Sequence, residues 1–249
     1  MRGVALLAVV GAAILYLNSH RRLSDPVEYV PMHEKVVALT LDDGPHPVFT
    51  PEVLQELDRE HVKATFFMIG TQMEKYPEVV REVAARGHVI GNHTYTHPYD
   101  LGQESPAGIR AEIAKSERLT ERLTGQRPRL FRPPRGRKEA VVLAIARKAG
   151  YRTVLWTVCA DNEHAQTPAA MAQRVVDRLR PGSIILAHDG TIPARARDVE
   201  AVVLIIRGAK AKGYRLVTLP ELLALGDRER RGASPPPRRA EATPRPARG

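Results

Sequence analysis

Two adjacent carboxylates follow a short apolar segment near the start of the chain. Residues 40–45 have the sequence TLDDGP, so Asp42 and Asp43 come directly after a run of apolar residues. Charged side chains at the end of a buried strand are costly unless a cation neutralises them. The pair therefore indicates either a metal site in which one carboxylate stays free as a base, or a turn capped by two aspartates.

Two histidines supply further candidate ligands. Residues 93–97 have the sequence HTYTH, and side chains at i and i+4 lie on one face of a helical turn, close enough to bind one ion. This spacing alone is weak evidence. Together with one of the two aspartates, His93 and His97 make a set of three ligands that leaves positions open for water or substrate, as a catalytic metal site requires.

An arginine and a third histidine complete this group of polar residues. Arg132 precedes a Pro-Pro turn and can pair with a carboxylate, and His188 stands in the segment LAHD at 186–189. A base, an acid and a metal are the groups needed to hydrolyse an acyl bond.

The polar residues follow apolar segments that alternate with amphipathic ones. Segments rich in β-branched or aromatic residues and bounded by Gly, Pro or Asp are typical of buried parallel strands. They cover residues 36–41, 64–69, 88–92, 130–132, 153–158, 183–187 and 215–219. Helical spacing predicts helices over 51–60, 77–86, 106–124, 138–149, 168–179 and 198–212. Thr50 is the predicted N-cap of the first helix, which would begin with Pro51.

This alternation predicts repeated right-handed βα units. The polar clusters fall at the carboxyl ends of predicted strands, where α/β barrels place their active sites. The preferred α/β architecture is therefore a distorted parallel (β/α) barrel of about seven strands, with an open doubly wound sheet as the second choice.

The two ends of the chain differ from its middle. Residues 4–17 are an uninterrupted apolar run with basic residues on both sides. The run is shorter than the roughly twenty residues of a membrane span and fits an export signal. We expect residues 1–22 to be a signal peptide or membrane anchor, 23–34 a linker, 35–225 the catalytic domain and 226–249 a disordered basic tail. The protein would be exported, or anchored to the cytoplasmic membrane facing outward.

Composition narrows the partners and the kind of metal site. The formal charge of +10 fits an anionic wall polymer or lipid better than a nucleic acid, because the chain has no zinc finger or RNA-binding aromatic motif and only 5% aromatic residues. The single cysteine, Cys159, excludes an internal disulfide framework and a cysteine-rich zinc site.

Taken in order, the polar segments resemble the motifs of the polysaccharide deacetylase family (carbohydrate esterase family four, the chitooligosaccharide deacetylase homology domain). The resemblance spans roughly residues 28–225. The family's Thr-Phe-Asp-Asp-Gly-Pro, His-Thr/Ser-x-x-His, Arg-x-Pro-Tyr/Arg-Gly and Leu-x-His-Asp motifs have counterparts at 40–45, 93–97, 132–136 and 186–189.

The resemblance implies a role for each matching residue. Asp42 would be the general base, and Arg132 would keep it in place and ionised. Asp43, His93 and His97 would bind a divalent metal, usually zinc, with cobalt as the alternative.

Further roles concern the substrate and the acid. His188 would protonate the departing amine, and Leu186 would contact the acetyl methyl group. The backbone N–H of Arg135 would help to stabilise the tetrahedral oxyanion. Many members have tyrosine at the position of Arg135, and arginine resembles the subgroup that acts on N-acetylmuramic acid, which carries a lactyl carboxylate.

The fourth family motif is eroded. Residues 156–163 have the sequence WTVCADNE, in which Asp161 is the best partner for His188. A one-residue shift would place Cys159 there instead. Trp156 can stack on a sugar ring, or it can be a core residue.

The expected reaction is hydrolysis of the acetamide of N-acetylated amino sugars in a cell-wall or extracellular glycan, with peptidoglycan favoured and chitin-type oligomers next. The alternatives are a deacetylase of O-acetylated polysaccharide, a non-catalytic glycan-binding protein on the same fold, and a metal amidase of a small cytosolic amide. The expected partners are the glycan and, through the N-terminus, a membrane.

Overall fold

The computed structural model describes residues 26–161, 167–192 and 195–232. The predicted signal or anchor, residues 1–22, lies outside these ranges. Within them, no helix has the length and apolar character needed to cross a membrane.

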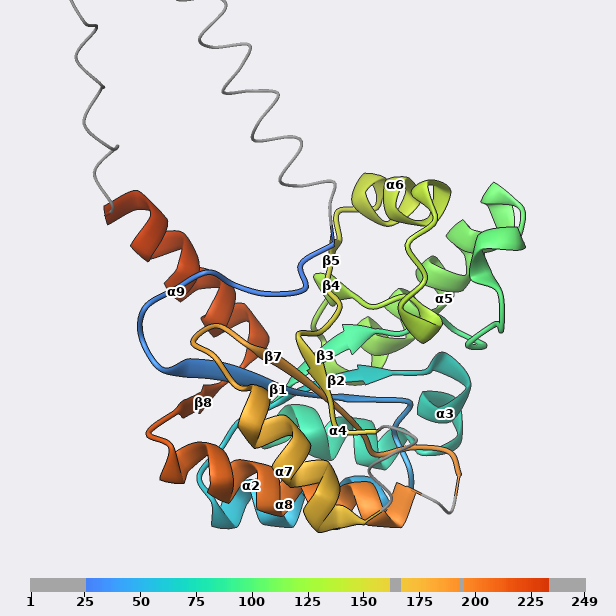
Figure 1. Ribbon diagram of the computed structural model, residues 1–249. Helices are drawn as coiled ribbons and strands as arrows, with labels where there is room; N and C mark the ends of the chain where they lie inside the picture. Colours follow the sequence, from blue (N-terminus) through green and yellow to red (C-terminus); the bar gives the residue numbers. More distant parts are fainter. Residues whose placement is uncertain (1–25, 162–166, 193–194, 233–249) are drawn as a thin grey trace, which may run out of the picture.

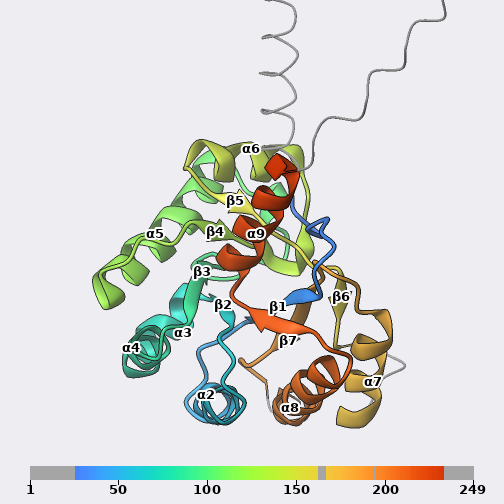
Figure 2. The same ribbon diagram turned by 90° about the vertical axis from the view of Figure 1, so that its left-hand side faces the viewer.

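The described strands form one sheet. They are β1 (Val36–Asp42), β2 (Thr65–Met68), β3 (Val89–Asn92), β4 (Leu130–Phe131), β5 (Arg152–Thr153), β6 (Val158–Cys159), β7 (Ile184–His188) and β8 (Arg215–Val217). Their order is β5-β4-β3-β2-β1-β7-β6, all neighbours are parallel, and β8 pairs with the first half of β1. Figure 2 shows these strands arranged in an arc.

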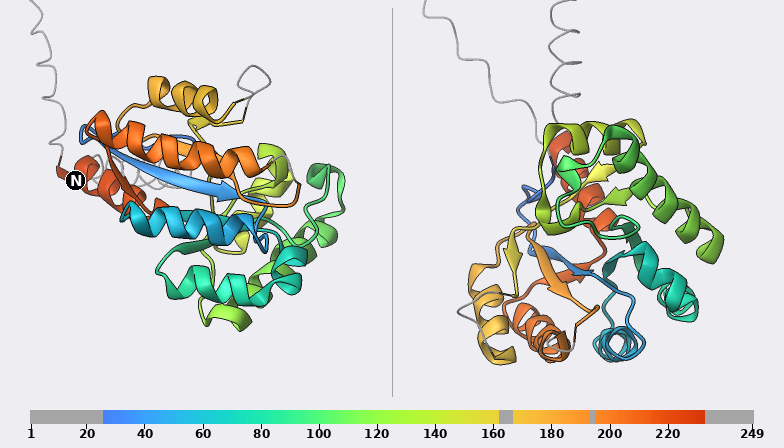
Figure 3. Two further views of the ribbon diagram at one scale, coloured as in Figure 1. Left: turned by 90° about the horizontal axis from the view of Figure 1, so that it is seen from below. Right: turned by 90° about the vertical axis from the view of Figure 1, so that its right-hand side faces the viewer.

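Helices cover the sheet between successive strands. They are α2 (Phe49–Arg59), α3 (Gly70–Lys75), α4 (Pro77–Ala85), α5 (Pro106–Thr124), α6 (Ala140–Lys148), α7 (Pro168–Arg178), α8 (Ala196–Ala211) and α9 (Leu219–Gly232), with short 3-10 helices at Leu101–Gln103 and Pro134–Gly136. Helices α2 and α8 lie beside β1, and α7 packs on α8 (Figures 1 and 3).

The curled sheet confirms the predicted distorted barrel, but one predicted strand is wrong. The single strand expected at 153–158 is two short strands, β5 and β6, which lie at opposite ends of the sheet. Between them the carbonyls of Val154 and Leu155 accept hydrogen bonds from Arg132. This segment crosses from one end of the arc to the other and nearly closes the barrel.

Strand β1 shows how the sequence directs side chains to two cores. All seven of its residues are buried, as in a parallel strand that is covered on both faces. Val37, Leu39 and Leu41 join the outer core formed with the helices, whereas Val36 and Ala38 belong to the inner core. The period of two in a strand then places Thr40 and Asp42 on the inner side.

Helix α9 extends past the predicted domain boundary at residue 225. Its Leu219, Leu222 and Leu223 are buried in the inner core. Gly226 is also buried, and a Cβ there would come within 2.2 Å of Val30. The folded part therefore includes residues 226–232, which were expected in the tail, and residues 233–249 lie outside the described ranges.

Two local expectations are also corrected. The predicted linker joins the sheet edge through the bridges Val27–Val154 and Tyr29–Ser183. Helix α2 begins before Thr50, with Val48 as its N-cap. Thr50 therefore lies inside the helix, where its hydroxyl accepts from His46 N–H at 2.9 Å and donates to the buried carboxylate of Asp189 at 2.6 Å.

Candidate active site and metal centre

A fully buried ion pair joins Asp42 at the end of β1 to Arg132 just after β4. Arg132 Nη1 donates to Asp42 Oδ1 at 2.6 Å and to Thr40 Oγ1 at 2.9 Å. Its Nε and Nη2 donate to the carbonyls of Val154 and Leu155 at 3.2 and 2.8 Å. These four hydrogen bonds fix the guanidinium, as expected from the sequence. One carboxylate oxygen of Asp42 is thereby held, and Oδ2 is left for other chemistry.

Asp43, His93 and His97 converge on one point beside this pair. Their ligand atoms all lie within 4.8 Å of one another. Asp43 Oδ1 is 3.5 Å from His93 Nε2 and 3.4 Å from His97 Nε2. One carboxylate oxygen and two imidazole nitrogens are donors that suit zinc and similar divalent cations, so the residues present fit such an ion.

The histidine turn is built differently from the helical turn that the spacing predicted, and that expectation is wrong. Thr94 and His97 have positive φ values of 67° and 57°. Asn92 Oδ1 accepts from Thr94 N–H, and Thr94 Oγ1 accepts from His97 N–H. The carboxylate of Glu112 in α5 accepts from the backbone N–H groups of residues 95 and 96, which lie between Thr94 and His97. Side-chain acceptors thus hold a tight non-helical turn that still brings both rings to Asp43.

His93 is oriented by its second nitrogen. With the ring Nδ1 donating to the carbonyl of Arg132 at 2.6 Å, Nε2 is left with its lone pair toward Asp43. A carbonyl on the far nitrogen of a ligand histidine is a common way of fixing ring orientation in metal sites. The same arginine residue therefore positions both Asp42 and His93.

The charges of the cluster favour a cation. Burial by itself would raise the pKa of Asp43, but its interactions with His93, His188 and His97 hold it far below the usual value. Burial disfavours a proton on His93, yet the negative charges of Asp42 and Asp43 raise its pKa. Negative charge that attracts a proton to this ring would equally attract a metal ion in its place.

His188 lies on the strand beside Asp42. The two residues are partners in the β1–β7 register, and the period of two places His188 on the inner side with Leu186. The carboxylate beside its ring is Asp198 in the first turn of α8, with Nδ1 to Oδ1 at 3.7 Å. Asp161, the partner expected from the sequence, instead accepts from Arg195 at 2.7 Å. That assignment is wrong.

The sequence offered little sign of Asp198. It belongs to no family motif quoted above, and the sequence pattern marks it only as the first residue of the predicted helix 198–212. Only the packing of α8 against β7 brings it to His188.

The remaining predicted site residues surround this centre. Arg135 has a left-handed φ of 57°, and its guanidinium stacks 4.1 Å from the ring of the exposed Tyr99. Leu186 is buried on the inner side of β7. Trp156 packs on the inner core and lies under the turn at Gly136, where a Cβ would come within 2.7 Å of its ring. Trp156 is therefore mainly a core residue.

Asp189 is a further buried carboxylate, and its part in the site was not foreseen. Burial raises its pKa to about 7, assisted by the charges of Asp43 and Asp42 and opposed by the hydrogen bond from Thr50. A Cβ on Gly44 would come within 2.7 Å of its oxygens. The glycine of the TLDDGP segment thus allows Asp189 to pack under the turn that presents Asp43.

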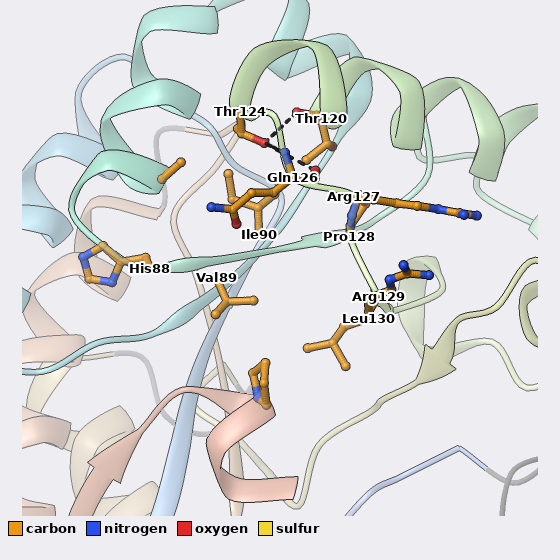
Figure 4. A pocket seen from close by; sticks show the side chains of 12 residues that line it. His88, Val89, Ile90, Thr120, Thr124, Gln126, Arg127, Pro128, Arg129 and Leu130 are labelled. Carbon is orange, nitrogen blue, oxygen red and sulfur yellow. Dashed lines mark hydrogen bonds between the residues drawn. The ribbon is translucent and has the colours of Figure 1, made fainter. Parts of the chain in front are cut away.

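A hollow of about 220 Å³ lies directly beside the metal ligands. Its lining consists of Asp43, Ile69, Thr71, Gln72, Thr96, His97 and Thr191. A second cavity, of about 200 Å³, lies at the opposite ends of the strands (Figure 4). Its lining includes His88, which precedes β3, and Leu130, which begins β4. None of the candidate catalytic residues lines that second cavity. Of these two cavities, only the hollow beside Asp43 and His97 borders the candidate metal ligands.

Comparison with known proteins supports the family resemblance that the sequence motifs indicated. A model of the polysaccharide deacetylase family matches residues 29–154. The chain is 38% identical to a peptidoglycan-N-acetylglucosamine deacetylase of Bacillus cereus, over 82% of this chain and 97% of the relative. It is 38% identical to a chitooligosaccharide deacetylase of Bradyrhizobium sp., over 75% and 90%. A crystal structure of a peptidoglycan N-acetylglucosamine deacetylase superimposes with a TM-score of 0.78 at 36% identity, covering 82% of this chain and 94% of that one.

Proposed function

Since the chain belongs to the polysaccharide deacetylase family, we infer that it is a hydrolase that removes acetyl groups from N-acetylated amino sugars of a glycan. The observation that carries this inference is the convergence of Asp43, His93 and His97 next to the Asp42–Arg132 ion pair. Ligands for a cation, a held base and a histidine on the neighbouring strand are the groups that amide hydrolysis needs. We propose peptidoglycan as the favoured substrate and chitin-type oligomers as the next.

We propose that Asp43, His93 and His97 hold a divalent metal ion, with zinc first and cobalt second. When bound, such an ion supplies Lewis-acid chemistry to the acetyl carbonyl. Structural zinc sites are closed by four protein ligands that are often cysteines, whereas this set has three ligands and no cysteine. The fourth position is thereby left for substrate.

The side chains divide the proton transfers between them. Arg132 holds Oδ1 of Asp42, so Oδ2, which lies 3.7 Å from His93 Nε2, faces the metal ligands and takes the proton of the attacking water. His188 gives a proton to the leaving nitrogen as the C–N bond breaks. The products are acetate and a free amino sugar.

Two further residues would position the acetyl group. Leu186 is the register partner of Thr40 and lies two residues before His188 on the inner side of the sheet, and it provides an apolar contact for the methyl group. The left-handed backbone at Arg135 turns its N–H out of the regular hydrogen-bond pattern, and we propose that this N–H stabilises the oxyanion.

Acetate release tests the function directly. Purified protein loaded with zinc should release acetate from peptidoglycan and from chitin oligomers, and a chelator should abolish the release. Acetylated xylan is the control that separates amide from ester hydrolysis. No release from any of the N-acetylated glycans would contradict the proposed function.

Arg135 provides a test of the favoured substrate. If its guanidinium, which stacks on the ring of Tyr99, meets the lactyl carboxylate of muramic acid, Arg135→Tyr should lower activity on muramic-acid substrates alone. A charge-assisted hydrogen bond of about 1.5–3 kcal/mol predicts a loss of roughly tenfold to a hundredfold in specificity constant. Arg137→Gln is the matched control, because that arginine instead pairs with Asp100 and Glu139. Equal small losses on both substrates would remove this support for peptidoglycan.

We also propose that residues 1–22 direct export or anchor the protein, on the strength of the apolar run at 4–17. Cell fractionation combined with N-terminal sequencing of the recovered protein distinguishes a cleaved signal from an anchor. Recovery of the full-length chain in the cytosolic fraction would contradict both.

A further inference from the structure

The imidazole of His188 lies against a carboxylate that is completely buried. Asp198 is 0% exposed, and its Oδ1 is 3.7 Å from His188 Nδ1. Among the residues that the structure describes, neither Nδ1 of His188 nor either oxygen of Asp198 has a hydrogen-bond partner. Two of these buried atoms, Nδ1 of His188 and Oδ1 of Asp198, therefore face each other at slightly more than hydrogen-bond distance.

An arginine lies on the other side of the same carboxylate. Arg195, the N-cap residue of α8, has its Nη1 3.6 Å from Asp198 Oδ2 and 2.7 Å from Asp161 Oδ2. The side chain of Asp161 is 32% exposed, so it forms the outer end of this row. The order from the site outward is histidine, buried aspartate, arginine and partly exposed aspartate.

Burying the Asp198 carboxylate in this way lowers the stability of the fold. A buried carboxylate without hydrogen bonds loses its hydration and gains only partial Coulombic compensation from an arginine 3.6 Å away. Catalytic hydrogen bonds are often long in the free enzyme and tighten when substrate binds. The cost of burying Asp198 is therefore understandable if it acts on His188.

We propose that Asp198 is the positioning residue of the general acid. Its Oδ1 accepts the Nδ1 proton of His188, which directs Nε2 toward the leaving nitrogen, and Arg195 keeps the carboxylate in place. This inference rests on the proposed function, because it assigns His188 as the acid. It also explains how the site can work although the fourth motif is eroded.

Kinetics on an N-acetylglucosamine oligomer tests the inference. Asp198→Asn keeps the shape of the side chain and should lower kcat on the order of a hundredfold with little change in KM. In the His188→Ala background the same substitution should cost nothing further, because its effect passes through that ring. Asp161→Asn is the matched control and should cost less than about threefold, since it removes a carboxylate from the same arginine without touching His188.

Stability separates a functional carboxylate from a structural one. Asp198→Asn removes a buried charge while Arg195 keeps its hydrogen bond to Asp161, so the melting temperature should stay equal or rise. A large fall in the melting temperature, or an equal loss of kcat in the His188→Ala background, would overturn the proposal. So would a larger loss of kcat from Asp161→Asn than from Asp198→Asn.

A measurement independent of turnover completes the test. Long-range ¹H–¹⁵N spectra of the histidine rings, with His188 assigned from a His188→Gln variant, should show its neutral ring protonated on Nδ1. Asp198→Asn should change this signal and Asp161→Asn should leave it in place. A ring protonated on Nε2 in wild type would overturn the proposal. If wild type releases no acetate, the proposed function fails while these spectra still decide the Asp198–His188 contact.

Discussion

The two neighbouring carboxylates of the TLDDGP segment should respond in opposite ways to the same substitution. Asp42→Asn removes the negative charge that lies 2.6 Å from Arg132, a residue with no exposed surface. Asp43→Asn leaves that pair intact and alters the metal ligand set. Asparagine tolerates the left-handed φ of 75° at residue 43 as readily as aspartate does, so Asp43→Asn is a matched control for stability.

The expected magnitude for Asp42→Asn follows from the burial of the pair. Removing one partner of a buried ion pair costs about 3–5 kcal/mol. The lower end applies, because the asparagine oxygen can still accept from Arg132. With about 2–4 °C per kcal/mol for a chain of this size, the melting temperature should fall by roughly 6–12 °C, and that of Asp43→Asn by less than about 3 °C.

Three measurements distinguish the variants. Melting is compared in metal-free protein, so that binding of the ion does not add to the stability. Metal content should stay at the wild-type ratio in Asp42→Asn and fall in Asp43→Asn. Acetate release by Asp42→Asn should drop by about a hundredfold or more, as expected on loss of a general base. Equal metal loss in both variants, or a wild-type melting temperature for Asp42→Asn, would refute the division of labour between these residues.

Three other predictions follow from the described contacts. His93→Ala and His97→Ala should each lose zinc in stoichiometric analysis, and full occupancy in both would exclude the proposed ligand set. Burial, together with nearby Lys63, lowers the pKa of His88 from 6.5 to about 4. As the pH falls, the unfolded chain therefore binds a proton at His88 before the folded protein does. The contribution of this residue to the free energy of unfolding is full above pH 6.5 and falls by up to about 3 kcal/mol as the pH drops toward 4. His88→Gln should flatten that part of the plot of unfolding free energy against pH, and an unchanged slope would contradict this. Truncation after residue 232 should preserve the melting temperature, whereas truncation after 225 should lower it, because Gly226 packs on Val30; equal melting of both products would show that this end of α9 adds nothing.

Much of the site could be predicted because it depends on chain order. In a parallel sheet, residues that follow the strands gather at one edge, so the aspartates after β1, the histidines after β3 and His188 at the end of β7 had to lie near one another. Strand periodicity also fixed which residues of β1 point inward. These relations require only that each apolar segment becomes a strand, and the structure confirms that for the strands carrying the site.

Other features depend on where a side chain from a distant segment arrives. The carbonyls of Val154 and Leu155 turn away from sheet pairing because Arg132 donates to them, so a segment that looked like one strand became two. The turn at 93–97 is shaped by Glu112 of α5, and nothing in the local spacing indicates that acceptor.

The sequence by itself predicted which residues are the candidate ligands, base and acid and in which order they occur, since these are written as residue types at the ends of apolar segments. Only the tertiary structure decided that Asp198, and not Asp161, lies beside His188. Asp161 stands in the segment of the fourth motif, whereas Asp198 belongs to none of the quoted motifs. The choice between them depends on how α8 packs against β7 and on Arg195, which binds Asp161 at the outer side. Periodicity predicts the face on which a residue lies, but three-dimensional packing selects the residue it meets.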